Sequence, residues 1–286
     1  TAGKVTAGNL FSLTYAKASE LDGDQNNDGN TSDTTEDITK IVSTKSAFAA
    51  LRADGSVVAW GNSGTGGNSS GVSSALDGTV NVKDIYSNMS AFAALKADGS
   101  VITWGYNAFG GDSSTVANKI TTTSHSDFKA VTDISSTGSA FAAIRSDGSV
   151  VTWGNSQDGG DSSAVATAID GDTDPTDVVQ VYSTTSAFAA LLKNGAVITW
   201  GDVNNGGSSS DVASKLNGSV DVVKIFSTNS AFAALKSDGS IVSWGKADRG
   251  GDISSVSAEL DGDSNGDGNA SDTSQDITKV FSTTMA

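Results

Sequence analysis

Two aspartate-rich stretches hold the residues best suited to chemistry. Each carries Asp or Asn at positions 1, 3, 5, 7, 9 and 12 of a twelve-residue loop. Side-chain and backbone oxygens at this spacing can turn inward and surround a hard cation such as calcium. The first stretch places Asp22, Asp24, Asn26, Asp28, Asn30 and Asp33 at these positions. The second stretch places Asp261, Asp263, Asn265, Asp267, Asn269 and Asp272 at these positions.

Both stretches resemble the calcium loop of EF-hand proteins. Position 6 of that loop needs a residue that tolerates positive φ, and here it is Gly266 in one stretch and Asn27 in the other. Position 12 is Asp, one methylene shorter than the Glu usual in that loop. The resemblance implies two Ca²⁺ sites with dissociation constants of about 10⁻⁴ to 10⁻³ M, as in extracellular modules. The alternative is a pair of solvated acidic loops.

The other residues offer little for catalysis. The chain has no Cys and a single His, so a Ser-His-Asp arrangement would have to use His125. His125 lies in the polar stretch TTTSHSDF, where we expect an exposed loop residue. Paired carboxylates for glycoside hydrolysis stay open because Asp is abundant. Near-identical repeats are unlike an active site, so we expect no enzyme activity and assign no catalytic residue.

One unit recurs five times and supplies the framework for these loops. In each copy the Phe of SAFAA and the Trp of a Trp-Gly pair keep the same separation, as between Phe92 and Trp104. An aliphatic residue follows that Trp at a second constant separation, as Ile120 does, whereas the stretch from there to the next Phe varies in length. A one-residue slip turns the buried face of a strand outward, but a surface loop accepts insertions at small entropic cost. The constant part is therefore predicted to form strands, and the variable part a connector.

Three short strands are predicted in each repeat. DVVKIFS alternates apolar and polar residues, AFAALK follows it, and DGSIVSWG begins with an Asp-Gly pair that favours a tight hairpin turn. GGDSSAVATAI offers a Ser as N-cap and places Val165 and Ile169 four residues apart, which predicts one or two helical turns. The constant place of the five Trp residues favours packing between repeats over sugar stacking. The paired glycines favour turns and a close approach of neighbouring repeats.

The unit resembles the RCC1 repeat. The resemblance rests on FAALKADGSVITWG, on Asn107 and on the pair Gly110 and Gly111, and it covers nearly the whole of each repeat. The His usual in that family before the second strand is replaced by the Ser-Ala of SAF. The resemblance implies an all-β fold, an RCC1-like β-propeller in which neighbouring units cover each other's apolar faces. An open β-solenoid is the alternative.

We treat residues 1–286 as a single repeat domain. Residues 1–47 are expected to supply a closing strand in NLFSLTY and the first calcium-type connector, and residues 48–286 five repeats that end in a partial blade. The strand of KIVS type occurs six times but SAFAA only five times. We therefore predict that KVFST near the C-terminus and NLFSLTY near the N-terminus share a composite blade and close a ring of about six blades.

The charge of the chain excludes some partners. Its 33 acidic residues against 17 basic ones give a formal net charge of −16, which opposes binding to nucleic acid and to anionic lipid. No apolar run approaches the roughly 20 residues needed to span a bilayer. An acidic chain without Cys fits an extracellular or bacterial cell-surface location where calcium is available.

These features predict a non-catalytic structural or adhesion repeat module that calcium stabilises. Its expected partners are other copies or segments of a larger surface protein. The alternative is a propeller that binds a glycan or a protein ligand through its variable connector loops. Tyr106 and Phe109 are the candidates for such a contact, because the other repeats have polar or small residues at these two positions.

Overall fold

The computed structural model describes residues 38–171, 177–260 and 280. These residues form five antiparallel sheets of three strands, which follow one another in sequence order. We call these sheets blades 1 to 5. The first strands are β1 (Ile38–Ser43), β4 (Val82–Ser87), β7 (Val131–Ser136), β10 (Val178–Ser183) and β13 (Val222–Ser227). The second strands are β2 (Ala47–Arg52), β5 (Ala91–Lys96), β8 (Ala140–Arg145), β11 (Ala187–Leu192) and β14 (Ala231–Lys236). The third strands are β3 (Val57–Gly61), β6 (Val101–Gly105), β9 (Val150–Gly154), β12 (Val197–Gly201) and β15 (Ile241–Gly245).

The prediction of three strands per repeat is confirmed, and the Asp-Gly pairs make the hairpin turns. In blade 2, Gly99 has a φ of +78°, a conformation that only Gly adopts at no steric cost. The carboxylate of Asp98 accepts a hydrogen bond of 2.9 Å from the backbone N–H of Ser100 and closes the turn. This turn sets the register that places Phe92 opposite Trp104 on the two paired strands.

Short helical segments follow the third strand of each blade, as predicted. The main ones are η2 (Ser70–Ala75), η4 (Ser114–Val116) with α2 (Ala117–Ile120), η6 (Ser163–Ala168), η8 (Ser210–Lys215) and η10 (Ser254–Glu259). The turns before them are η1 (Ser63–Thr65), η3 (Asn107–Phe109), η5 (Ser156–Gly160), η7 (Val203–Asn205) and η9 (Ala247–Arg249). The expected Ser cap is wrong in detail, because Ser162 makes no side-chain capping bond. Asp161 accepts the N–H of Ser163 instead, at 2.8 Å.

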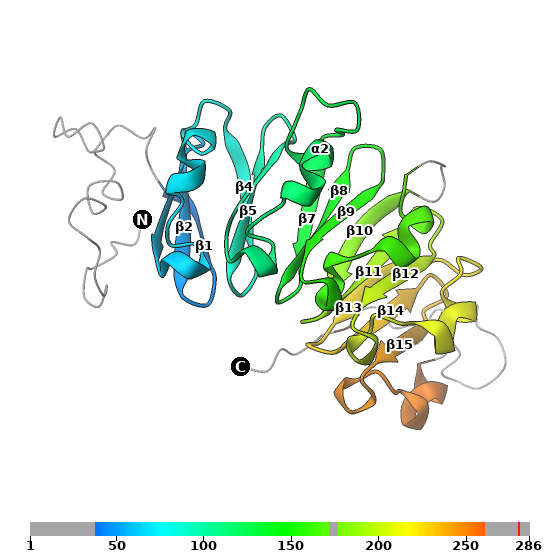
Figure 1. The fold of residues 1–286 in the computed structure, drawn as a ribbon. Coiled ribbons are helices and arrows are strands. Elements are labelled where there is room, and N and C mark those ends of the chain that lie inside the picture. Colours follow the sequence, from blue (N-terminus) through cyan, green and yellow to red (C-terminus); the bar gives the residue numbers. More distant parts are fainter. Residues whose placement is uncertain (1–37, 172–176, 261–279, 281–286) are drawn as a thin grey trace, which may run out of the picture.

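The blades follow one another in a curved row, from β1 in blade 1 to β15 in blade 5 (Figure 1). Hydroxyl groups connect the first strands of neighbouring blades. Ser87 donates to the carbonyl of Ser43 at 2.8 Å, and Ser136 donates to the carbonyl of Ser87 at 2.8 Å. Consecutive first strands are therefore neighbours along the row.

The hydrophobic core lies between blades rather than within one. Four clusters of buried side chains are present, and each joins one blade to the next. In the first cluster, Ala49 and Leu51 of blade 1 pack against Ile85, Phe92 and Trp104 of blade 2. We call the side of a blade that packs on the preceding blade its front face, and the opposite side its back face. A junction is the contact between one back face and the next front face.

The predicted composite blade lies outside the described residues, apart from Val280. It stays a prediction, and so does the count of about six blades. In the described ranges, no helix combines the length and the apolar character needed to cross a membrane.

Candidate functional site: the junction between blades

The predicted calcium ligands lie outside the residues that the structure describes. They are Asp22, Asp24, Asn26, Asp28, Asn30, Asp33, Asp261, Asp263, Asn265, Asp267, Asn269 and Asp272. Within residues 38–171 and 177–260, no group of three or more His, Cys, Asp or Glu residues is placed to hold a metal ion. The calcium sites therefore stay a prediction from the sequence.

His125 lies in the connector between α2 and β7, where the sequence placed it in a loop. Its ring is half-exposed, and Nδ1 accepts a hydrogen bond of 3.2 Å from the backbone N–H of Asp127. This bond closes a turn. The ring therefore acts there as a local acceptor that holds the connector in shape.

The junctions are the feature that the structure repeats most closely, and their centre is a Phe ring placed over a glycine. In the first junction, a Cβ added to Gly66 would lie 2.5 Å from Cδ2 of Phe92. Gly66 also has a φ of +100°. Only Gly meets both conditions, because any side chain would collide with the ring and strain the backbone. The same contact pairs Gly110 with Phe141, Gly159 with Phe188 and Gly206 with Phe232.

A Trp completes each junction. Trp104 stacks on Phe92 with 5.1 Å between ring centroids, and its Nε1 donates a hydrogen bond of 2.9 Å to the carbonyl of Gly66. Gly66 thus makes two contacts with blade 2. The Phe92 ring packs where a side chain would be, and the carbonyl accepts a hydrogen bond from the Trp104 indole. Trp153, Trp200 and Trp244 donate in the same way to Gly110, Gly159 and Gly206, each at 3.1 Å.

The predicted packing role of these Trp residues is confirmed. The indole rings of Trp104, Trp153, Trp200 and Trp244 are at most 4% exposed, so none offers a surface for sugar stacking. Sequence reasoning missed the pairing itself. Its signal was present, since Phe, Trp and the paired glycines all keep their offsets in every repeat.

A ladder of backbone hydrogen bonds runs along the whole row. It passes through the turn between the first and second strand of each blade. The N–H of Lys45 donates to the carbonyl of Met89, that of Met89 to Gly138, that of Gly138 to Thr185, and that of Thr185 to Asn229, at 2.7 to 3.1 Å. One rung per junction aligns the blades at a common height.

The two ends of the row differ from its interior. Phe48, on the front face of blade 1, is 44% exposed, whereas Phe92 is fully buried. Trp60 beside it is half-buried. At the other end, Gly250 is exposed, and no heavy atom of the described residues lies within 4 Å of the place of a Cβ. Each end therefore carries one half of a junction.

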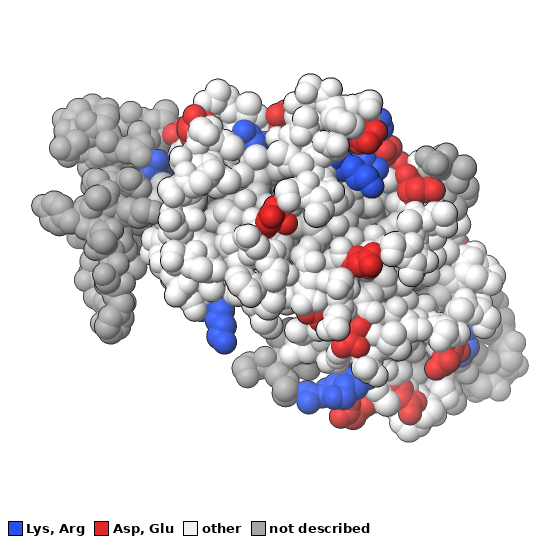
Figure 2. All heavy atoms as spheres, viewed as in Figure 1, with Lys and Arg blue, Asp and Glu red and all other residues white. Residues whose placement is uncertain are grey.

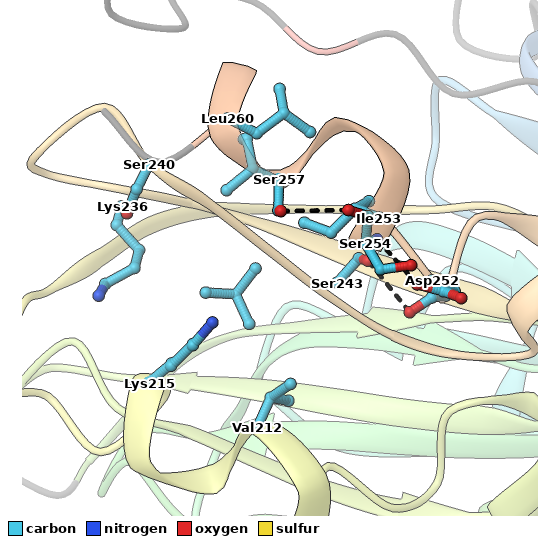
Figure 3. A pocket seen from close by; sticks show the side chains of 13 residues that line it. Val212, Lys215, Lys236, Ser240, Ser243, Asp252, Ile253, Ser254, Ser257 and Leu260 are labelled. Carbon is cyan, nitrogen blue, oxygen red and sulfur yellow. Dashed lines mark hydrogen bonds between the residues drawn. The ribbon is translucent and has the colours of Figure 1, made fainter. Parts of the chain in front are cut away.

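A groove opens beside each junction, lined by a helical segment of one blade and the third strand of the next. The four grooves have volumes of about 380, 520, 430 and 770 Å³ from blade 1 to blade 5. In the last groove, Val212 and Lys215 come from η8 and face the side formed by β15 and η10 (Figure 3). Lys236 and several Ser side chains complete the lining. These hydroxyl and ammonium groups suit hydrogen bonding to a polar ligand.

Several aspartates have lowered pKa values because they accept hydrogen bonds in the turns that they close. Backbone and hydroxyl hydrogen bonds from Ser114, Ser163 and Ser254 hold the pKa values of their partners below the usual range. These partners are Asp112, Asp161 and Asp252. They stay charged at neutral pH and keep the helical segments capped.

Tyr86 is the phenol that the junctions perturb most. Burial raises its pKa first, and the neighbouring carboxylate of Asp133, which accepts its hydroxyl at 3.0 Å, raises it further. Tyr86 therefore remains neutral and joins blade 2 to blade 3.

Charged side chains are scattered over the face shown in Figure 2, with broad uncharged areas between them. Fourteen of the 33 acidic residues, but three of the 17 basic ones, belong to segments outside the described ranges. Most of the excess negative charge therefore belongs to segments that the structure does not describe.

Tyr106 and Phe109, the predicted contact residues, lie together at the turn after β6. Their rings meet edge to face with 5.2 Å between centroids, and Tyr106 is 51% exposed. At the place of Tyr106 the other blades have Asn62, Asn155, Asp202 and Lys246. Blade 2 thus differs from the rest by an aromatic pair, in which Tyr106 is exposed and Phe109 is half-buried.

A search against protein-family models finds no match, and neither does a search of curated proteins. Solved structures with a similar chain path include Prp20p from Saccharomyces cerevisiae, reported with its binding to Gsp1p and histones. It is 17% identical, with a TM-score of 0.48, over 75% of this chain and 58% of Prp20p. Human WBSCR16 is 18% identical, with a TM-score of 0.45, over 73% of this chain and 62% of that one. The ectodomain of the Arabidopsis thaliana receptor kinase ACR4 is 16% identical, with a TM-score of 0.43, over 73% of this chain and 69% of that one.

The fold follows from the chain itself. Each repeat builds a three-stranded antiparallel blade, and each of blades 2 to 5 buries its apolar front face on the blade before it. The Asp-Gly turn, the Trp-Gly end of the third strand and the paired glycines lie in the order that the sequence analysis recognised. The described chain has an all-β, RCC1-like β-propeller repeat fold.

Proposed function

We infer that this protein is a non-catalytic structural repeat module that acts outside the cell or on its surface. The observation that carries this proposal is the junction. Four times, a Phe and a Trp of one blade are inserted on a glycine of the blade before it. Side chains used in this way hold blades at a fixed spacing and leave the connectors to vary.

Calcium binding at the two aspartate-rich connectors is part of the proposal. Clustered carboxylates repel one another until a divalent cation neutralises them, so calcium would order these connectors. The ligand spacing, kept in two separate stretches, supports this assignment. The excess acidic charge of the chain fits surroundings in which calcium is plentiful.

Thermal unfolding with and without calcium tests this proposal. At 10 mM Ca²⁺, a site with a dissociation constant of 0.1 to 1 mM adds about 1.4 to 2.7 kcal/mol to the free energy of unfolding. Replacing Asp263 and Asp267 by Asn should remove the gain from the second loop. Replacing Asp211, an exposed carboxylate of η8, by Asn makes the same kind of charge change outside the two loop sequences. A melting temperature that ignores calcium in the wild-type chain would contradict the calcium assignment.

A second function, binding of a glycan or protein ligand, is favoured by one observation. The exposed ring of Tyr106, packed on the half-buried ring of Phe109, breaks the symmetry of the repeat at a surface turn. Aromatic rings on a surface bury large apolar areas at little entropic cost and stack on sugars or side chains. A glycan array with the intact chain should then give a signal that Tyr106→Ala abolishes. Lys246→Ala, at the equivalent turn of blade 5, should keep it.

A further inference from the structure

We propose that the back face of blade 5 binds the front face of blade 1 of a second copy of this chain, so that copies join head to tail. The inference rests on the proposed structural function and names the partner of its junction. It would add a fifth junction, between chains, to the four within each chain. It competes with the composite blade predicted from the sequence, which would cover the same two faces from within one chain.

The back half of that junction is already formed. Gly250 has a φ of +99°, the same as Gly206, whose missing side chain receives Phe232. Within residues 38–171 and 177–260, no heavy atom lies within 4 Å of the place where a Cβ of Gly250 would be. Val256, on the helical segment next to it, is 39% exposed, whereas its counterpart Val212 packs against the core of the last junction. The surface around Gly250 and Val256 therefore has the same backbone shape as the surface around Gly206 and Val212, but no Phe ring of the described residues packs on it.

The front half is also formed. Phe48 and Trp60 stack with 5.4 Å between centroids and 23° between ring planes. The four pairs inside junctions have 5.1 to 5.3 Å and 21° to 28°. Ile41 beside them is 58% exposed, whereas its counterpart Ile85 is buried. Since both halves hold the docked geometry, association needs little ordering.

The backbone ladder continues across the same contact. Inside the chain each rung runs from an N–H of one blade to a carbonyl of the next. Among the described residues, the ladder starts at Lys45 and ends at Asn229. In a head-to-tail pair, the N–H of Asn229 would donate to the carbonyl of Lys45 of the second copy.

The geometry favours a chain of copies over a symmetric pair. The front and back faces are different surfaces, so the contact is heterologous and leaves one free half at each end of the assembly. Two lysines, Lys224 and Lys40, occupy the same place on the first strands that would be neighbours. Their repulsion, and the net charge of −16 on each copy, should make association stronger as salt is added.

Sedimentation velocity on the full chain tests the proposal, at concentrations up to hundreds of micromolar and at low and high salt. Phe48→Asp removes the ring and adds a charge to the front face. Gly250→Asn places a side chain where the ring would dock, and Asn tolerates positive φ better than other residues. Val203→Ser is the control, since Val203 is 66% exposed on an internal blade. Circular dichroism and thermal unfolding check that each variant is folded.

The wild-type chain and Val203→Ser should associate, more strongly at high salt. Each blocking variant alone should lose about tenfold or more in association constant, the effect of removing one anchoring contact. A mixture of the two blocked variants should form dimers and nothing larger, because each keeps the half that the other lacks. If Phe48→Asp does not fold, Ile41→Asp blocks the same face.

A wild-type chain that stays monomeric, or blocked variants that associate as the wild type does, would overturn the proposal. So would a mixture that forms no dimer. Each of these results leaves calcium binding and the melting temperature unchanged, so failure of the assembly is distinct from failure of the structural function.

Discussion

Phe92 and Phe48 occupy the same place in two neighbouring blades, yet their surroundings differ completely. Both lie on a second strand, opposite a Trp, in a stacked pair of nearly the same geometry. Phe92 is fully buried and Phe48 is 44% exposed. The difference is the preceding blade, whose Gly66 covers Phe92. A side chain of this protein is therefore buried by the neighbouring blade and not by its own repeat, as in other proteins built from stacked units.

The largest difference is expected between two Phe truncations. Phe141→Ala opens a cavity in the second junction, where the side chain is fully buried, and should cost about 3 to 5 kcal/mol. Phe48→Ala should cost less than about 1 kcal/mol, because the side chain is already partly in water. Urea unfolding of dilute protein, followed by tryptophan fluorescence, measures both. Equal losses from the two variants would mean that contacts inside each blade, and not contacts between blades, stabilise the fold.

The next comparison uses two glycines with the same backbone. Gly66→Ala and Gly250→Ala both place a Cβ at a φ near +100°, which costs about 1 to 2 kcal/mol in either position. At Gly66 the Cβ would also collide with Phe92, and overpacking of this kind adds about 1 to 3 kcal/mol. The difference between the two losses of unfolding free energy measures the cost of the collision with the Phe92 ring. A difference near zero would show that Phe92 moves aside freely.

A smaller effect is expected from removing the indole N–H. Trp153→Phe keeps a stacked ring but leaves the carbonyl of Gly110 without its 3.1 Å hydrogen bond, which costs about 1 to 3 kcal/mol for a buried acceptor. Trp60→Phe should change stability by less, since its ring lies at the open end of the row. Thermal unfolding of the two variants side by side gives the comparison. A loss from Trp60→Phe as large as that from Trp153→Phe would contradict it.

The smallest effect is expected on the stability of the protein at acid pH. The pKa of Asp161 is lowered by hydrogen bonds from Ser163 that form only in the folded chain. Its contribution is therefore complete above the unfolded pKa of about 4 and is lost as pH falls through the lower folded value. The side chain is exposed, so water screens the effect and the loss is small. Asp161→Asn should flatten the decline of stability below about pH 4 and should lower stability at pH 7 only slightly. Asn68 caps blade 1 in the same way.

The repeat frame could be predicted because its signals are local. The constant separation of Phe and Trp and the Asp-Gly pair between them define a hairpin without any knowledge of how the repeats pack on one another. The glycine that receives Phe92 is Gly66, which belongs to the preceding blade. Periodicity identified both residues as constant but did not pair them, since the pairing depends on how blades stack.

The cap and the ends of the row were beyond sequence reasoning for physical reasons. Asp and Ser are equally good helix caps, so the sequence of adjacent Asp161 and Ser162 could not decide between them. Phe48 and Phe92 stand in the same SAFAA context, so only the three-dimensional neighbours distinguish them. The calcium ligands were predicted from spacing alone and remain to be tested.

The indole protons give the most direct test of the junction account. The chain has five Trp residues and therefore five indole N–H signals in a nitrogen-edited NMR spectrum. On the Gly250→Asn chain, which blocks end-to-end contact, four of them should exchange slowly with water because they donate to buried glycine carbonyls. The fifth should exchange quickly and vanish in Trp60→Phe. Five indole protons with equal protection would contradict the claim that each blade is completed by the one before it.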